Sequence, residues 1–313
     1  MSINKFFITV IVSLLNINLI TCDLREKEDF FPPPPPLDEW WKQIESGGEI
    51  YNDFRYKIED EGIKIIRYEG EGGEVIIPAE IEGIPVTTIG IYSFREKNLA
   101  NVYIPDSITS IGNGAFVDNI LTSVVIPDSV IFIGSGAFAR NKLESVNIPN
   151  NITSIESGLF AQNNITSIII IPDSVTSIGR SAFSHNCLGV VVIPDCVTYI
   201  GEYAFSTTRL RNIKISNNIT RIEPYTFIFN DLKSVVIPES VNSIGNHAFS
   251  ANHSLIEITI GEDVYLDVFT FGAFMDGNRI IDFGFNNTYD DNRKQAGTYS
   301  RPDTTSNVWT KQE

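Results

Sequence analysis

A phenylalanine recurs at a nearly constant interval through most of this chain. Every interval in the series is 22 residues except the one between Phe160 and Phe183, which is 23. The prolines of a recurring Ile-Pro pair keep the same step. A fixed period of about 20 to 50 residues predicts a repeat architecture in which similar coils stack into a solenoid. The series consists of Phe94, Phe116, Phe138, Phe160, Phe183, Phe205, Phe227 and Phe249.

Each repeat contains a predicted strand, a turn and a return segment. The strand has the pattern Leu-x-x-Val-x-Ile, as in Leu121, Val124 and Ile126. The proline that follows has no N–H to donate and should end the pairing, while Asp128 and Ser129 favour a turn. One repeat cannot bury its apolar stripe alone, so neighbouring repeats must stack to remove it from water. We therefore expect a parallel β-sheet on one face of the solenoid and short β or irregular segments on the other.

Two further slots of the repeat carry specific expectations. Gly134 is expected to adopt a backbone conformation that other residues disfavour. Glu156 and Glu223 occupy this slot in two coils, which should therefore be distorted. An asparagine three residues after the phenylalanine should close a corner, because its amide stabilises tight turns. These asparagines are Asn119, Asn141, Asn163, Asn186, Asn230 and Asn252.

The last coil departs from the pattern. Gly261 replaces the proline, and the segment FTFGAF predicts that the phenylalanine step stretches to Phe274. We interpret this coil as a cap over the apolar end, with Trp309 as its lid. The sequence then divides into a signal peptide (1–22), a proline-rich linker (23–50), an N-terminal hairpin cap with the first coil (51–98), the solenoid of ~22-residue coils (99–285) and a C-terminal cap or tail (286–313).

The N-terminus has the features of an export signal. Lys5 precedes an apolar stretch from Phe6 to Ile20, which is shorter than the ~20 residues that span a bilayer. The stretch ends in Leu-Ile-Thr-Cys, which resembles a bacterial lipobox and makes Cys22 the candidate lipid-attachment residue. The alternative is an ordinary cleaved signal and a secreted protein. Cys187 and Cys196 fall in variable slots, and a bridge between them is left open.

The repeat resembles a known family. Its pattern of IPDSVTSIG, AF, N and LTSVVIP is similar to the BspA-type leucine-rich repeats of bacterial surface proteins, also called the Treponema pallidum type. The resemblance covers most of the chain from Phe54 onward, and the tail from Asp290 to Glu313 is similar to tails of spirochaete members. It implies a leucine-rich-repeat solenoid, often on a surface or outer-membrane lipoprotein, that adheres to host matrix proteins or to other bacteria.

Charge and motifs argue against several functions. The net charge of −16 disfavours a nucleic-acid partner, because phosphate binding needs a concentrated basic surface. The chain has three histidines and no Gly-x-Ser-x-Gly or His-Glu-x-x-His motif. We therefore expect no enzyme, no cofactor and no metal. A row of acids at the Ile-Pro-Asp turns could bind calcium or a basic partner, although turn residues that cap backbone N–H groups are the simpler interpretation. The row comprises Asp106, Asp128, Asp173, Asp195 and Glu239.

The outer face of the predicted sheet is the candidate binding site. Side chains alternate across a strand, so the residue between the two inward apolar positions should point outward. Five of these eight residues are apolar or aromatic, although β-branched residues also favour strands for structural reasons. The predicted ligand-binding residues are Tyr103, Val125, Asn147, Ile169, Val192, Lys214, Val236 and Thr259.

These observations predict a non-enzymatic surface protein that binds other proteins, as an adhesin for host matrix or bacterial surface partners. The alternative is a structural or coat antigen without a specific ligand. An enzyme would need a further catalytic domain, and the segment beyond residue 285 is too short to form one.

Overall fold

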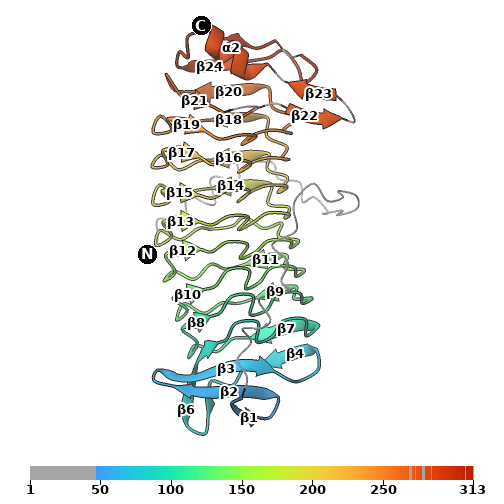
Figure 1. Cartoon of the computed structure of the whole chain (residues 1–313), viewed down its shortest axis with the longest axis vertical. Helices are drawn as coiled ribbons and strands as arrows, with labels where there is room; N and C mark the ends of the chain where they lie inside the picture. The colour runs from blue at the N-terminus through green and yellow to red at the C-terminus, as the bar shows by residue number, and fades with distance from the viewer. Residues whose placement is uncertain are drawn as a thin grey trace. The chain divides into compact units, whose positions relative to one another are not determined.

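The computed structural model describes residues 47–267, 270–271, 273–276, 279–282, 284–306 and 308–312. The predicted signal peptide, Cys22 and most of the predicted linker lie outside these residues. From the first coil to helix α2 (Phe285–Asp291), the chain winds into successive stacked coils (Figure 1). The predicted solenoid is confirmed.

One wall of the solenoid is built from the Leu-x-x-Val-x-Ile segments, and we call it the LVI wall. Its strands pair in parallel, as β9 does with β11 and β14 with β16. Alternate residues point into the core, so Val124 is buried while Val125 is exposed. The strands are β4 (Gly73–Ile76), β7 (Leu99–Tyr103), β9 (Ser123–Val124), β11 (Ser145–Val146), β14 (Val190–Val192), β16 (Asn212–Lys214), β18 (Ser234–Val236) and β20 (Glu257–Ile260).

A second parallel ladder lies beyond the proline turn, where the sequence predicted short β or irregular segments. We call it the SI wall, after the Ser-Ile pair that recurs in four of its nine strands. The isoleucine that ends each strand of this wall from β6 to β19 is buried, as at Ile111 and Ile133. Its strands are β6 (Ile84–Ile89), β8 (Ser110–Ile111), β10 (Phe132–Ile133), β12 (Ser154–Ile155), β13 (Ser177–Ile178), β15 (Tyr199–Ile200), β17 (Arg221–Ile222), β19 (Ser243–Ile244) and β21 (Tyr265–Leu266).

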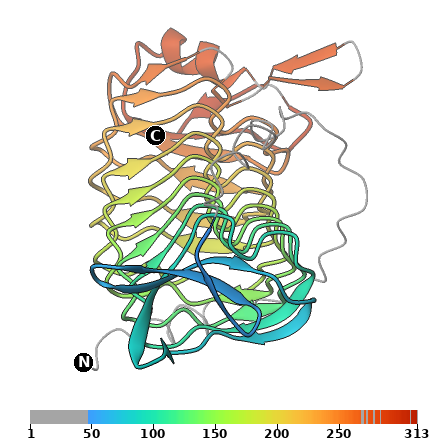
Figure 2. The same ribbon diagram turned by 60° about the horizontal axis from the view of Figure 1, so that its bottom comes forward.

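Antiparallel strands cover the N-terminal end of the stack. Strand β1 (Glu49–Tyr51) pairs with β2 (Phe54–Glu59), and β2 pairs with β3 (Gly62–Tyr68). Strand β3 then pairs in parallel with β6, to which the short strand β5 (Glu80–Ile81) also adds. Figure 2 shows the hairpin of β2 and β3 lying across the first coils. The expected hairpin cap is therefore present.

The C-terminal end is covered by a different set of elements. Strand β24 (Gly297–Ser300) pairs antiparallel with β20, and β25 (Thr310–Lys311) pairs with β24. Strands β22 (Ala273–Asp276) and β23 (Arg279–Asp282) form a separate hairpin. Trp309 is buried with its ring centroid 5.3 Å from that of Phe285, as expected for a lid.

The third wall carries the buried phenylalanines, and we call it the Phe wall. Rings in successive coils stack with centroid separations of 5.0–6.0 Å. The series continues to Phe271, which lies 22 residues after Phe249 and stacks on it at 5.1 Å. The predicted stretch to Phe274 is therefore wrong, because the last coil keeps the regular step.

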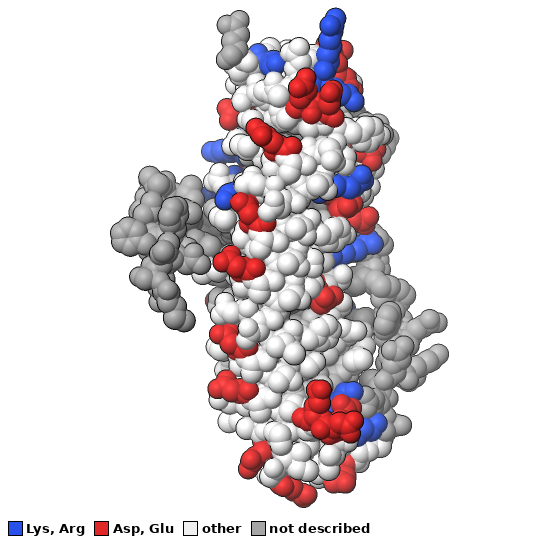
Figure 3. All heavy atoms as spheres, turned by 90° about the vertical axis from the view of Figure 1, so that its left-hand side faces the viewer, with Lys and Arg blue, Asp and Glu red and all other residues white. Residues whose placement is uncertain are grey.

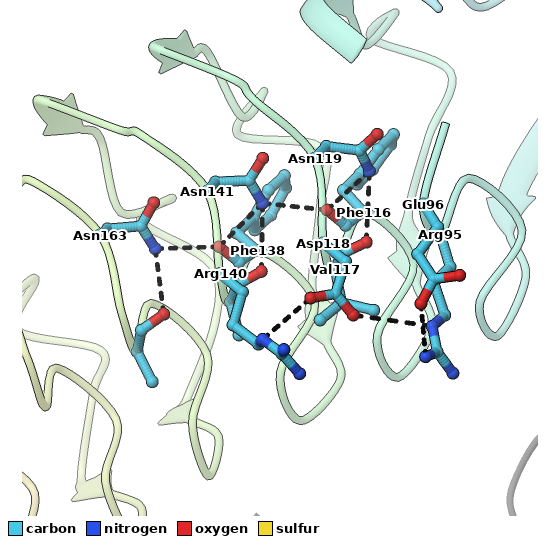
Figure 4. Close-up of polar contacts among 12 residues, drawn as sticks. Arg95, Glu96, Phe116, Val117, Asp118, Asn119, Phe138, Arg140, Asn141 and Asn163 are labelled. Carbon is cyan, nitrogen blue, oxygen red and sulfur yellow. Dashed lines mark hydrogen bonds and ion pairs between the residues drawn. The ribbon is translucent and has the colours of Figure 1, made fainter. Parts of the chain in front are cut away.

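The corner asparagines join the coils through their amides. Asn141 Nδ2 donates to the carbonyl of Phe138 in its own coil, at 3.2 Å, and to that of Phe116 in the preceding coil, at 2.9 Å. Its Oδ1 accepts from the N–H of Leu121, also in the preceding coil, at 3.1 Å. Figure 4 shows this row beside ion pairs that link Asp118 to Arg140 and Arg95. The same pattern recurs at Asn119, Asn163, Asn186, Asn230 and Asn252.

Glycine is needed at position 134 for a different reason from the one predicted. Gly134 does not have a positive φ, whereas Gly136, two residues later, does, at 64°. A Cβ on Gly134 would lie 2.5 Å from the backbone nitrogen of Asn113 in the preceding coil. Glycine is required there because two backbones approach closely, and the prediction of an unusual conformation at Gly134 is wrong.

The two coils with glutamate in this slot interrupt the SI wall. The ladder runs from β6 through β8 to β10, restarts at β12, ends at β15 and restarts at β17. Glu156 and Glu223 directly follow β12 and β17. No ladder joins β10 to β12 or β15 to β17 within the described residues, so both glutamate coils coincide with a break in the wall. The expected distortion of these coils is confirmed.

The glycine contact predicts unequal costs at two neighbouring glycines. Gly134→Ala should lower the free energy of unfolding by about 1–3 kcal/mol, because the methyl group overpacks against a backbone. Gly136→Ser should cost about 1 kcal/mol or less, since its Cβ would meet no atom within 4 Å and Ser181 adopts the same positive φ in an equivalent slot. Urea unfolding of both variants measures the difference, and equal losses would contradict the close-approach explanation.

Replacing a corner asparagine should lower the free energy of unfolding, and a hydroxyl at the same position should partly restore it. Asn141→Ala should cost about 2–4 kcal/mol, because it leaves buried carbonyl and N–H groups without partners. Asn141→Thr should cost less, since Thr208 replaces asparagine in another coil and donates its hydroxyl to Phe205 O at 2.7 Å. Thermal and urea unfolding check this order, and an alanine variant as stable as the threonine variant would refute it.

Candidate functional site

The outward side chains of the LVI wall form a row along the solenoid. We define the outer row as Tyr103, Val125, Asn147, Ile170, Val192, Lys214, Val236 and Thr259. The register of the strands aligns neighbours in this row, such as Val192 with Lys214. Four apolar members are strongly exposed, with fractions of 61% for Tyr103, 76% for Val125, 60% for Ile170 and 63% for Val236. These side chains have no core to fill.

One predicted member of the row points inward. Ile169 is buried and bridges in parallel to Val191, a core residue. The outward residue of this coil is Ile170, because the extra residue of the 23-residue interval lies before Ile169, where Ile168 is partly exposed. A shift of one residue moves a side chain to the other face of a strand. Counting backward from Pro172 instead of forward from Phe160 identifies Ile170 from the sequence.

Two other predicted members have structural roles. Asn147 is exposed, but its amide accepts from Ile126 N at 2.9 Å and donates to Ile126 O at 2.7 Å. It therefore completes the backbone pairing with the preceding coil. Thr259 lies under the C-terminal cap, where its hydroxyl is 2.9 Å from that of Thr298 on β24. The outer row thus ends at Val236 as an open surface.

The apolar surface extends beyond the predicted residues at its N-terminal end. Ile76 aligns with Tyr103 in the pairing of β4 with β7 and is strongly exposed. Ile76 was not among the predicted ligand-binding residues. The signal was present, because VIIP at residues 75–78 repeats the VVIP pattern of the coil strands.

The turn acids lie along the edge between the LVI wall and the SI wall. Figure 3 shows a file of acidic side chains along one side of the SI wall. Asp128 Oδ1 accepts from Asn150 N at 3.0 Å, and Asp195 Oδ1 accepts from Asn217 N at 2.9 Å. The backbone and side-chain donors of Asn217 hold the pKa of Asp195 below its usual value. These two acids cap backbone N–H groups, as the simpler interpretation predicted.

The remaining turn acids differ. The carboxylates of Asp106 and Asp173 are exposed and form no hydrogen bond or ion pair with any part of the chain that the structure describes. Within the same described ranges, no group of three or more His, Cys, Asp and Glu side chains is placed to hold a metal ion.

Three cations occupy the C-terminal part of the LVI wall. Arg211, Lys214 and Lys233 are exposed, and the described residues offer none of them an ion pair. Asp231 and Glu257 lie nearby in sequence or register, so this region has mixed charge. The charge along the wall therefore changes after Val192.

Two of the three histidines, His185 and His247, lie on the Phe wall. His185 and His247 occupy left-handed slots, with φ of 56° and 55°. Burial lowers the pKa of His247, whose Nδ1 lies 3.0 Å from Ser250 Oγ and whose ring stacks on Tyr225.

Cys196 is a free thiol, so it forms no bridge with Cys187.

Membrane attachment was predicted through Cys22, which lies outside the described residues. Among the residues that are described, no helix has the length and apolar character needed to cross a bilayer.

Comparison with known proteins identifies the repeat. The model of the BspA type leucine-rich-repeat region matches residues 78–188 and 164–280, with six copies of the repeat. No curated protein matches the chain. A leucine-rich cell surface protein from Faecalibacterium prausnitzii A2-165 is 27% identical over 68% of this chain and 76% of its own, with a TM-score of 0.47. The T. pallidum leucine-rich-repeat protein is 24% identical over 71% of this chain and 88% of its own, with a TM-score of 0.35.

The family match covers residues 78–280, about two thirds of the chain, and its repeats coincide with the coils described above. This protein belongs to the BspA-type leucine-rich-repeat family.

Proposed function

We propose that this protein is an exported, non-enzymatic adhesin whose outer row binds a protein on a host matrix or on another bacterial surface. The observation that carries the proposal is the line of exposed apolar side chains from Ile76 through Tyr103, Val125 and Ile170 to Val236. Aligned apolar residues merge into a patch, and such patches commonly mark interaction sites.

The solenoid supports this proposal by holding the patch on paired strands. Solenoids bind partners along extended surfaces of this kind. β-branched residues also favour strands without any binding role, but Tyr103 and the exposed apolar side chains around it add area that only a partner would bury. The aromatic ring of Tyr103 is suited to anchor such a contact, since aromatic residues are enriched at interface cores.

Neutral polar substitutions test the outer row. Val125→Ser, Ile170→Ser and Val236→Ser together should weaken binding to a panel of fibronectin, laminin and collagen by at least about tenfold, because each buried aliphatic side chain contributes on the order of 1.5–3 kcal/mol. Ile131→Ser is the matched control, since Ile131 is 63% exposed on the SI wall. Surface plasmon resonance measures the affinities.

The proposal requires a difference between the two walls. Binding that survives the triple substitution, or that falls equally with Ile131→Ser, would contradict an outer-row site. Circular dichroism of each variant shows whether the coils remain folded.

We also propose that Cys22, at the end of a spirochaete-type lipobox, carries the lipid that anchors the protein to the cell surface. Cys22→Ala should move the protein from the detergent phase to the aqueous phase of a Triton X-114 partition, because several acyl chains anchor firmly and their loss leaves no anchor. A wild-type protein that already stays in the aqueous phase would leave only a cleaved signal and a secreted form.

A further inference from the structure

We propose that the partner contacts the five coils from Tyr103 to Val192 through a basic amphipathic helix; this inference rests on the proposed function of the outer row. The apolar residues Tyr103, Val125, Ile170 and Val192 each precede a turn acid in the same coil by three residues. The acids are Asp106, Asp128, Asp173 and Asp195. An apolar line, strongly exposed at Tyr103, Val125 and Ile170, and an acidic line therefore run side by side along the stack.

The strand-to-turn segments of this surface carry acids without cations. The segments from strand to turn in these five coils contain no lysine or arginine: they are LANVYIPDS, LTSVVIPDS, LESVNIPNN, ITSIIIIPDS and LGVVVIPDC. Glu144 adds a further exposed acid. The next two coils carry Arg211, Lys214 and Lys233, which would repel a basic helix and end its contact after Val192.

Two acids are available to a partner without loss of internal contacts. The exposed carboxylates of Asp106 and Asp173 have no bonded partner within the described part of the chain, unlike Asp128 and Asp195, which accept from Asn150 and Asn217. Charges at the rim of an apolar patch fix the orientation of a partner and raise its association rate. Lysine or arginine side chains beside an apolar stripe fit this arrangement.

The spacing of the row favours a helix over a strand. Successive coils of the wall repeat every ~4.8 Å, the separation of paired strands. An amphipathic helix presents apolar residues about once per 5.4 Å turn, whereas residues on one face of a strand lie about 6.6–6.8 Å apart. Five coils span four steps, about 19 Å, which corresponds to about 13 helical residues at 1.5 Å each.

The first test uses a designed peptide. A fluorescein-labelled 14-residue peptide of leucine and lysine, with leucines at i, i+3, i+4 and i+7, should bind the full chain in an anisotropy titration, and added salt should weaken the binding. The same peptide with glutamate in place of lysine should not bind. Equal binding of both peptides, or binding of neither, would overturn the inference.

Variants then locate the contact. Asp106→Asn with Asp173→Asn should weaken binding of the lysine peptide by at least about tenfold and reduce the salt dependence of that binding. Asp60→Asn with Glu61→Gln is the control, because it removes the same charge from the turn between β2 and β3. If both pairs weaken binding equally, net charge alone accounts for it and the inference fails.

Substitutions of Val125 separate this inference from the proposed function. For the matrix protein and the lysine peptide alike, Val125→Lys should weaken binding several-fold more than Val125→Glu. If both variants lose binding to the matrix protein equally, the outer row binds a partner that is not basic, and only the helix inference fails. If neither variant weakens binding to the matrix protein, the proposed site fails as well.

Discussion

The buried asparagine amide is the contact on which the stacking of coils depends. At each corner the chain turns sharply and leaves carbonyl and N–H groups that the strands cannot pair. Asn141 satisfies groups of Phe116, Phe138 and Leu121 at once, and these belong to two coils. A buried polar group without a partner costs about 1–3 kcal/mol, so adjacent coils are stable only in the register that brings the amide to these groups. The same register stacks the phenylalanine rings.

Hydrogen bonds along the Phe wall explain why the solenoid tolerates two interruptions of the SI wall. The SI wall loses its ladder at the coils of Glu156 and Glu223. The Phe wall continues across both positions: Phe138 N donates to Leu159 O at 3.1 Å across the first, and Phe205 N donates to Thr226 O at 3.0 Å across the second. The outer row therefore stays aligned along the stack, which is what an extended binding surface requires.

Sequence patterns predicted the parts of this structure that depend on composition within one coil. The phenylalanine step, the corner asparagines and the inward Val124 all follow from which residues recur. Distances between neighbouring coils do not follow from the residues that recur within one coil. Gly134 was therefore assigned to the right slot for the wrong reason, since its role is a close approach to Asn113. Ile169 was misplaced because the 23-residue interval contains one extra residue and the count ran forward from Phe160. Its bridge to Val191 shows that its side chain turns inward, as a count backward from Pro172 predicts.

The most direct measurement of the central claim is amide hydrogen exchange, resolved by residue, across the Glu156 coil. Continuous bonding along the Phe wall predicts that the amides of Phe116, Phe138, Phe160 and Phe183 are all protected and exchange at similar slow rates, as members of one cooperative unit do. Backbone amides of the SI wall next to the interruption should exchange faster. Protection that differs by orders of magnitude between Phe138 and Phe160 would show two independent stacks and would contradict the account.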